Sequence, residues 1–352
     1  MAYTDIDKPS DFFNTKLFTG NGSTNAITGV GFQPDWIWFK NRTQGQSHAI
    51  VDSVRGRKGL QSNSAEAEYT LNSGRDFGTF DNDGFTVLNP EQLNSFNYNN
   101  GSIVSWNWKA GTSFTNDASS TGIGSIDSAG SFNNDAGFSI FTFTGTGSIG
   151  TIKHGLNTKP DVIFIKGRSE AKAWTVYHSS LGAGKALFLQ ATDAAVDHPR
   201  YWNDVEPTTS VFTGGSSTNL TGSGITFVGY AFTAKKGYSK FGSYVGNGNA
   251  DGTFIYTGFK PAFVMTKPSN KTGEWFMIDN KRDPSNYVRR RLKANSNAAE
   301  NTDDNQDFDI LSNGFKPRRS AGDWNSSGDT FIYMAFAEQP FTTSTGVPAT
   351  AR

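Results

Sequence analysis

The fold is decided by the decapeptide GFQPDWIWFK at residues 31–40. In its second half both alternating faces are apolar, which is typical of a short strand covered on both sides. The run is too short for a helix, and its ends carry turn-forming residues. The sequence therefore predicts a buried β-strand here.

The same frame occurs three times along the chain. A proline is followed six residues later by a lysine, and twelve residues after that by a polar residue that ends an apolar run. In chain order these are Pro34, Lys40 and Asp52, then Pro160, Lys166 and His178, then Pro261, Lys267 and Asp279. An aromatic closing strand also recurs at 103–108, 227–232 and 331–336. Such regular spacing predicts three homologous units.

The repeat divides the chain into segments. They are an N-terminal docking segment (1–11), unit one (12–112), a linker rich in Gly, Ser and Asn (113–137), unit two (138–237), unit three (238–341) and a flexible tail (342–352). Short apolar runs bounded by Gly, Pro, Asn or Asp predict six to eight strands per unit. The predicted fold class is all-β, with three tandem small β-sandwich repeats of jelly-roll or immunoglobulin-like strand order.

Two local patterns refine the units. At residues 81–84 and 311–314, Asn or Asp precedes glycine between apolar runs, which predicts hairpin turns because glycine supplies a positive φ. The best helical candidate is the short segment 63–69.

A charge pattern also recurs. Arg55, Arg57 and Lys58 precede Glu66 and Glu68, and basic residues precede acidic ones again within 281–309. These opposite charges either face each other across strands or a protomer boundary, or form solvated loops of opposite sign.

Composition excludes several function classes. Lys and Arg number 32, as do Asp and Glu, so a general nucleic-acid binder or a polybasic membrane-surface protein is not expected. The absence of cysteine excludes disulfides, thiolate metal sites and cysteine nucleophiles. Neither a membrane-spanning apolar stretch nor a signal-peptide layout is present, so membrane insertion and signal-directed export are not expected.

Catalytic and metal motifs are not found in the sequence. The four histidines, His48, His154, His178 and His198, lack the spacing of a metal site, and no GxSxG elbow occurs. We therefore predict no catalytic residue, cofactor or metal ligand. Whether the acidic run 303–309 holds Ca²⁺ stays open, since it offers hard oxygens without the EF-hand pattern.

Three aromatic residues are candidates for ligand binding. Tyr201, Trp202 and Trp324 stand among polar residues rather than in strand patterns. One interpretation is that these rings stack on a sugar face. The other is that they plug an edge of the core.

Four motifs of unit one carry a family resemblance, at residues 31–42, 48–56, 80–87 and 104–111. This sequence resembles a repeated domain of unknown function in predicted structural proteins of marine tailed bacteriophages. The match is close over unit one and partial over units two and three, which lose the Asp-Ser-Val-Arg-Gly string of residues 52–56.

The resemblance implies a non-enzymatic virion protein, made in the host cytoplasm and exposed on the particle as a tail fibre, spike, appendage or capsid decoration. It implies roles in assembly and host attachment, other virion proteins as partners and a homo-oligomer, with a trimer favoured. The alternatives are a glycan-binding adhesin and, less favoured, a polysaccharide-degrading enzyme with two carboxylates about 5–9 Å apart. Repeated framework residues with variable loops argue against an enzyme.

Overall fold

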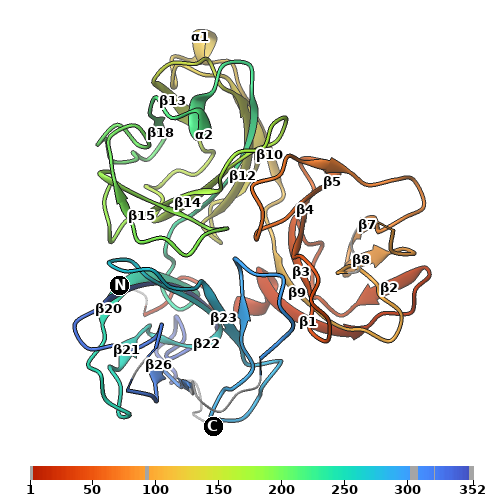
Figure 1. Cartoon of the computed structure of the whole chain (residues 1–352), viewed down its shortest axis with the longest axis vertical. Helices are drawn as coiled ribbons and strands as arrows, with labels where there is room; N and C mark the ends of the chain where they lie inside the picture. Colours follow the sequence, from red (N-terminus) through yellow and green to blue (C-terminus); the bar gives the residue numbers. More distant parts are fainter. Residues whose placement is uncertain (1–2, 92–94, 302–307, 321, 349–352) are drawn as a thin grey trace.

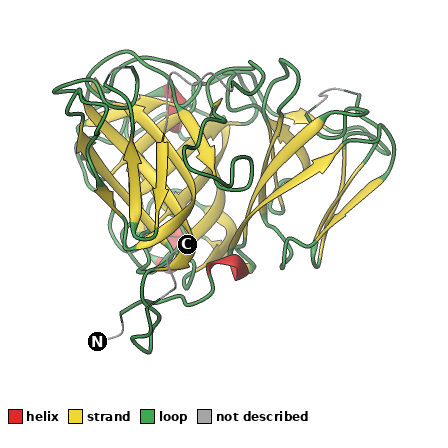
Figure 2. Cartoon of the chain, turned by 90° about the horizontal axis from the view of Figure 1, so that it is seen from below, coloured by secondary structure: helices red, strands yellow, loops and turns green. Residues whose placement is uncertain are grey.

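The chain folds into antiparallel sheets that form three bodies around a common centre (Figure 1). The structure is a computed structural model and describes residues 3–91, 95–301, 308–320 and 322–348. Strands make up 43% of it and helices 3%, and the helical turns are small beside the sheets (Figure 2). The predicted all-β class with sandwich units is confirmed.

Unit one forms a six-stranded sheet, in the order β1-β9-β3-β4-β5-β6, and a three-stranded sheet, β2-β8-β7. Its elements are the 3-10 turn Pro9–Asp11 and strands β1 (Phe13–Thr19), β2 (Asn25–Thr28), β3 (Trp36–Asn41), β4 (Ala49–Asp52), β5 (Gly56–Leu60), β6 (Tyr69–Thr70), β7 (Phe77–Asp81), β8 (Gly84–Val87) and β9 (Ser102–Trp108). It is the red-to-orange body of Figure 1.

Unit two forms an eight-stranded sheet, in the order β10-β11-β12-β19-β14-β15-β16-β17, and the pair β13-β18. Its elements are β10 (Thr112–Asn116), α1 (Ala118–Thr121), β11 (Ser128–Asn133), β12 (Phe138–Thr144), β13 (Gly150–Lys153), β14 (Val162–Gly167), β15 (Thr175–His178), β16 (Lys185–Phe188), β17 (Val196–Asp197), β18 (Val211–Gly214), α2 (Thr218–Thr221) and β19 (Thr226–Phe232).

Unit three forms a five-stranded sheet, in the order β20-β27-β22-β23-β24, and a three-stranded sheet, β21-β26-β25. Its elements are β20 (Ser239–Val245), β21 (Ile255–Tyr256), β22 (Phe259–Pro268), β23 (Phe276–Asp279), β24 (Leu292–Lys293), β25 (Phe308–Leu311), β26 (Gly314–Pro317) and β27 (Thr330–Pro340).

Strand pairing is nested in the same way in each unit. In unit one the first strand, β1, pairs with the last, β9, and the second, β2, pairs with β8. Strands β12 and β19 with β13 and β18 repeat this in unit two, as do β20 and β27 with β21 and β26 in unit three. Pairing of the outermost strands favours the jelly-roll order over the immunoglobulin-like order, two possibilities that the sequence left open.

The central strands of the large sheets, such as β3 and β14, are buried on both faces, as the opening decapeptide predicts for β3. Trp36 and Trp38 point from β3 into a central core shared by all three units. The alternate residues Ile37 and Phe39 point into the sandwich core of unit one. The described residues thus enclose three sandwich cores and one central core, in which the three large sheets face each other.

Aromatic rings join the units across the central core. Trp36 of unit one stacks on Tyr230 of unit two with ring centroids 4.7 Å apart. Phe336 of unit three stacks on Phe13 at 5.1 Å and contacts the edge of Phe232 at 5.7 Å. Aromatic pairs add stability beyond the area that they bury. The three units therefore form one packed body.

The segment 113–137 is not a linker. It forms β10, α1 and β11, a hairpin that extends the large sheet of unit two beyond β12. Its composition is polar because β10 is the edge strand of this sheet and exposes most of its residues to solvent, while β11 behind it is only partly buried. A Cβ at Gly130 would collide with the backbone of Ile140, so a small residue is required where β11 meets β12. The linker prediction is wrong because edge strands need few large apolar residues.

The helical prediction for residues 63–69 is also wrong. This segment is extended, and only its end joins β6. Its backbone bonds to unit two: Ala65 O accepts from Lys166 Nζ at 3.0 Å, and Glu68 N donates to Arg168 O at 2.8 Å. Hydrogen bonds to the neighbouring unit replace those that a helix would make within itself.

The two hairpin turns are confirmed. Asp81 pairs with Gly84 between β7 and β8, and Leu311 pairs with Gly314 between β25 and β26. A Cβ on Gly84 would collide with the carbonyl oxygen of Ile27, and the same holds for Gly314 and the neighbouring strand β21. Close approach of a third strand is thus a further reason for glycine here.

The first and last described segments of the chain contact other parts of the same chain. Thr4 is buried, and its hydroxyl donates to Lys236 O at 2.7 Å. Asp7 accepts a hydrogen bond from the backbone of Ser344 at 2.7 Å, so the N-terminal segment also meets the C-terminal tail. This part of the predicted docking segment contacts its own chain, and docking onto another protein stays a prediction.

Candidate functional site

The lysine of the repeated frame is buried at each junction between units. Lys40, Lys166 and Lys267 are 0% exposed. Each ammonium donates to a carbonyl oxygen of its own unit and to one of a neighbouring unit. The neighbouring acceptors are Asn297 O at 3.2 Å, Ala65 O at 3.0 Å and Thr192 O at 3.2 Å. The frame thus specifies a cyclic set of contacts, from unit one to three, three to two and two to one.

Burial has a strong effect on these lysines. It lowers the pKa of Lys166 from 10.5 to about 7, and that of Lys40 and Lys267 to about 8. Removing an ammonium from water disfavours its charged form, and the carbonyl oxygens compensate in part. The lysines therefore act as structural clamps at the interfaces.

A buried charge cluster lies between units one and two. Arg55 Nε is 2.6 Å from Asp52 Oδ2, and its Nη1 is 3.0 Å from Glu68 Oε2. Arg168 of unit two donates to Glu68 at 2.9 Å, and the Tyr230 hydroxyl donates to Asp52 at 2.7 Å. Two guanidinium groups thus balance two carboxylates across the interface.

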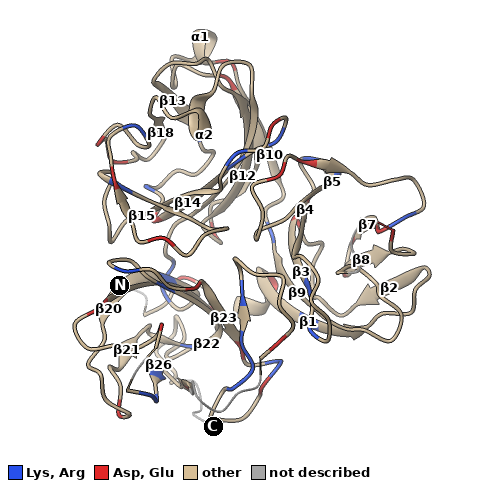
Figure 3. Ribbon diagram, in the orientation of Figure 1, with Lys and Arg blue, Asp and Glu red and all other residues tan. Residues whose placement is uncertain are grey.

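The counterpart cluster lies between units three and one. Arg282 Nε is 2.5 Å from Asp279 Oδ2, and its Nη1 is 2.9 Å from Glu300 Oε2. Arg42 of unit one binds Glu300 at 2.8 Å, and Trp106 Nε1 donates to Asp279 Oδ2 at 3.0 Å. Of the two interpretations of the charge pattern, pairing across a boundary therefore holds for these residues, and the boundary lies between units of one chain. In the whole molecule basic and acidic residues are interspersed over all three units (Figure 3).

The third interface, between units two and three, carries neutral residues at the same positions. They are His178 for Asp52, Leu181 for Arg55, Ala195 for Glu68 and Ser269 for Arg168. The register is the same because Ala195 N donates to Ser269 O, as Glu68 N donates to Arg168 O. Burial lowers the pKa of His178 to about 4, and its Nε2–H donates to Tyr333 O at 3.1 Å. The cluster is thus replaced as a set, which supports the structural interpretation of His178.

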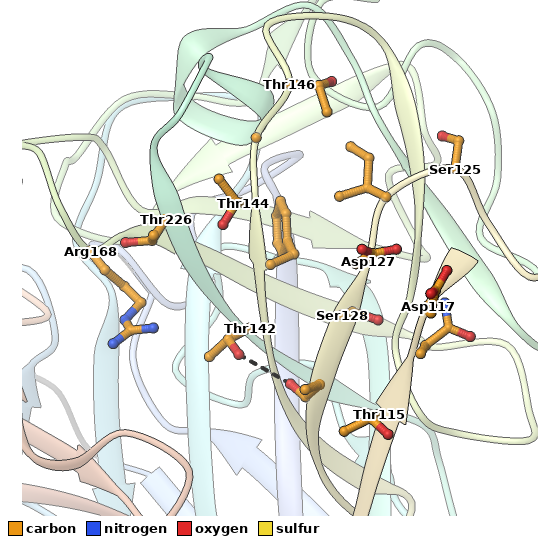
Figure 4. Close-up of a pocket in the computed structure, with 15 residues that line it drawn as sticks. Thr115, Asp117, Ser125, Asp127, Ser128, Thr142, Thr144, Thr146, Arg168 and Thr226 are labelled. Carbon is orange, nitrogen blue, oxygen red and sulfur yellow. Dashed lines mark hydrogen bonds between the residues drawn. The ribbon is translucent and has the colours of Figure 1, made fainter. Parts of the chain in front are cut away.

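A polar groove on unit two is the candidate site. It has a volume of about 700 Å³ and lies over β10, β11 and β12, beside the start of β19 (Figure 4). The labelled threonines Thr115, Thr142, Thr144 and Thr226 line it, together with the side chain of Arg168. Its size lies within the range of roughly 300–1,000 Å³ that small-molecule sites occupy.

Strand β12 explains why the groove is polar. Its alternate residues Phe138 and Ile140 lie in the central core. Thr142 and Thr144 continue the same face, because side chains alternate along a strand. In the sheet, Thr142 is paired with Ala129, and Thr144 with Thr226. The face therefore changes from apolar to hydroxyl-bearing where the sheet extends beyond the central core.

Two carboxylates lie at the rim formed by the β10–β11 hairpin. Asp117 caps α1, and hydrogen bonds from the Ser119 hydroxyl and the Ser120 amide lower its pKa. Asp127 accepts from Ala118 N at 2.8 Å. In Figure 4 Arg168 lies on the opposite side of the groove from both.

The aromatic residues predicted as ligand contacts lie in the core instead. Tyr201, Trp202 and Trp324 are at most 2% exposed. Trp202 packs edge-on against Tyr177 at 5.7 Å, and Trp324 stacks on Phe276 at 4.3 Å. Rings buried in this way present no face to a sugar, so the core interpretation is correct and the stacking prediction is wrong. The structure does not bring these residues together with the groove.

The groove is not predicted from the sequence, because its hairpin falls in the segment 113–137, for which the composition predicts a linker. The alternation of Phe and Thr at 141–144 was the available signal for a strand with one polar face. Within the described residues no group of three or more His, Asp or Glu side chains is placed to hold a metal ion. Most of the acidic run 303–309 lies outside the described residues.

The fold is that of an all-β protein of three sandwich units closed around a common core. The chain belongs to the family described as Domain of unknown function (DUF7483), whose profile matches residues 8–340. The match covers all three units, so the family is defined on the whole body rather than on one repeat. No curated protein and no solved structure matches the chain. In the described ranges no helix has the length and apolar character needed to cross a membrane.

Proposed function

We propose that the chain is a non-catalytic structural protein of a bacteriophage particle, displayed on its surface as part of a tail fibre, spike, appendage or capsid decoration. The observation that carries this proposal is the use of the repeated residues. The lysines, tryptophans and charge clusters of the frame all serve to pack three units into one body. The resemblance of unit one to phage structural proteins supports the same function.

The electrostatics of the carboxyl groups support a non-catalytic function. A glycoside hydrolase requires a general acid whose pKa is raised. In the described part of the chain, burial raises the pKa of Asp35. That carboxylate accepts from the Ser53 hydroxyl at 2.7 Å and from Ala110 N at 2.8 Å, which is a structural arrangement. In the groove, Asp117 has a lowered pKa and suits a permanent anion.

The proposal includes the partners and the location. The chain is made in the host cytoplasm, assembles with other virion proteins as a homo-oligomer, with a trimer favoured, and binds neither nucleic acid nor membrane interior. Mass spectrometry of purified particles tests the location, and light scattering of the purified chain tests its oligomeric state. Absence of the chain from particles, together with a stable monomer in solution, would refute the proposal.

A second candidate function is attachment to a glycan of the host surface. The groove on unit two favours it, because hydroxyl side chains and carboxylates are the groups that bind sugar hydroxyls. Both functions are compatible in one surface protein. A glycan array with the purified chain tests the second, and absence of binding to every glycan on it would refute it.

A further inference from the structure

The groove marks the place where unit two departs from the threefold pattern. In units one and three the large sheet ends at β1 and β20, the counterparts of β12. In unit two the added β10–β11 hairpin continues the sheet and walls the groove. New sites commonly arise on segments added to a scaffold. No described residue of β10 or β11 belongs to the central core, so packing of the three units does not require the hairpin.

The groove offers hydrogen-bonding groups that the protein leaves free. Thr115 and Thr144 are exposed, and their hydroxyls make no hydrogen bond to any described residue. The Thr226 hydroxyl, across the sheet from Thr144, is likewise free with respect to the described residues. A threonine hydroxyl both donates and accepts, which complements the hydroxyl groups of a sugar.

The charges of the groove select among saccharides. Asp117 and Asp127 accept hydrogen bonds and would repel an anionic chain. Arg168, on the other side, is paired through Nε and Nη2 with the carboxylate of Glu68, so its charge is balanced. Two carboxylates against one neutralised guanidinium favour an uncharged ligand over a sulfated or uronic one.

The backbone around the groove argues against a peptide ligand. A peptide that adds to a sheet requires a free strand edge. Strands β11 and β12, which form the groove floor, are hydrogen-bonded to a neighbour on both sides, and the free edge of β10 lies on its side away from β11. The groove crosses their faces, so its ligand is contacted by side chains. This suits a ligand that carries many hydroxyl groups.

We propose that the groove on unit two binds an uncharged oligosaccharide through Thr115, Thr144, Thr226 and the carboxylates of Asp117 and Asp127. This inference rests on the second candidate function and names its site and its ligand class. The backbone bonds of Asp117 and Asp127 hold both carboxylates in place before the sugar arrives, which lowers the entropic cost of binding.

The test uses the full-length chain and an array of neutral, sulfated and uronic oligosaccharides. Calorimetric titration with the best-bound neutral oligosaccharide then compares wild type with the double variant Thr144→Val/Thr226→Val, which removes two hydroxyls at nearly constant volume. The matched control is Thr19→Val, because Thr19 pairs with Ser102 in unit one as Thr144 pairs with Thr226 and lies outside the groove. We expect binding of neutral glycans, at least tenfold weaker binding by the double variant and unchanged binding by the control.

Three outcomes would overturn the inference. Neutral binding that the double variant leaves unchanged would refute the groove as the site, while the second candidate function would stand. Binding of anionic glycans alone would refute the ligand class. Absence of all binding would refute both the inference and the candidate function. Equal melting temperatures of the three proteins show that any loss of binding does not arise from unfolding.

Discussion

Replacing Arg55 by leucine tests the buried charge cluster between units one and two. The side chains of Arg55 and Asp52 are both 0% exposed, and that of Glu68 is 9% exposed. Without the guanidinium, Asp52 keeps the Tyr230 hydroxyl but loses its cation. Breaking a buried ion pair in this way costs about 3–5 kcal/mol, because a buried charge is left without compensation.

The interface between units two and three shows which neutral residues can replace the charge cluster without leaving a buried charge unpaired. A graft of its neutral residues consists of Asp52→His, Arg55→Leu, Glu68→Ala, Arg168→Ser and Tyr230→Met, the last because Met334 is the counterpart of Tyr230 in β27. All four charges leave together, so no uncompensated ion remains. The graft is therefore expected to recover more than half of the stability that Arg55→Leu loses.

Thermal unfolding followed by calorimetry measures both effects. At about 2.1 cal/mol/K per residue, the unfolding entropy of this chain is about 0.7 kcal/mol/K, so Arg55→Leu lowers the Tm by about 4–7 °C. Arg282→Leu at the counterpart cluster should give a similar loss. A Tm of Arg55→Leu within about 1 °C of wild type, or a graft no more stable than the single variant, would refute this account of the interfaces.

Three further predictions concern stability. The pKa of Lys166 is about 7 in the folded chain and 10.5 for a free lysine, so the unfolded chain binds more protons between these pH values and the free energy of unfolding rises with pH there. Lys166→Met should reduce this rise, measured by denaturant titration at pH 7 and at pH 9.5. An equal rise in the variant and in wild type would contradict the role of Lys166 as a clamp. Trp202→Ala should cost about 3–5 kcal/mol in the same titration, and an unchanged midpoint would show that the ring is not a core residue. Gly84→Ala should lower the Tm more than Gly224→Ala, because a Cβ collides with Ile27 O at the first and meets open space at the second; equal losses would contradict the close packing of β2 on β8.

Much of the fold followed from the sequence through residues with a strong local signature. The alternation in residues 36–39 predicted a strand covered on both faces, and glycine after Asn or Asp predicted the two hairpins. The spacing from Pro34 to Lys40 predicted equivalent units. These patterns are local or repeated, so they can be recognised without knowing which distant residues are in contact.

The remainder depends on contacts between distant segments. The segment 63–69 is extended because unit two supplies its hydrogen-bond partners. Nothing in the sequence of the segment itself indicates these hydrogen bonds. Trp202 stands between polar residues, yet the loop carries it into the core of unit two. The groove depends on where the central core ends along β12, which is a property of the assembled body.

Three units that close around one core should unfold as one body. Scanning calorimetry of the full chain tests this directly, through the ratio of the van't Hoff to the calorimetric enthalpy. We expect a single transition with a ratio near one. Three separable transitions, each with the enthalpy of about one unit, would contradict it.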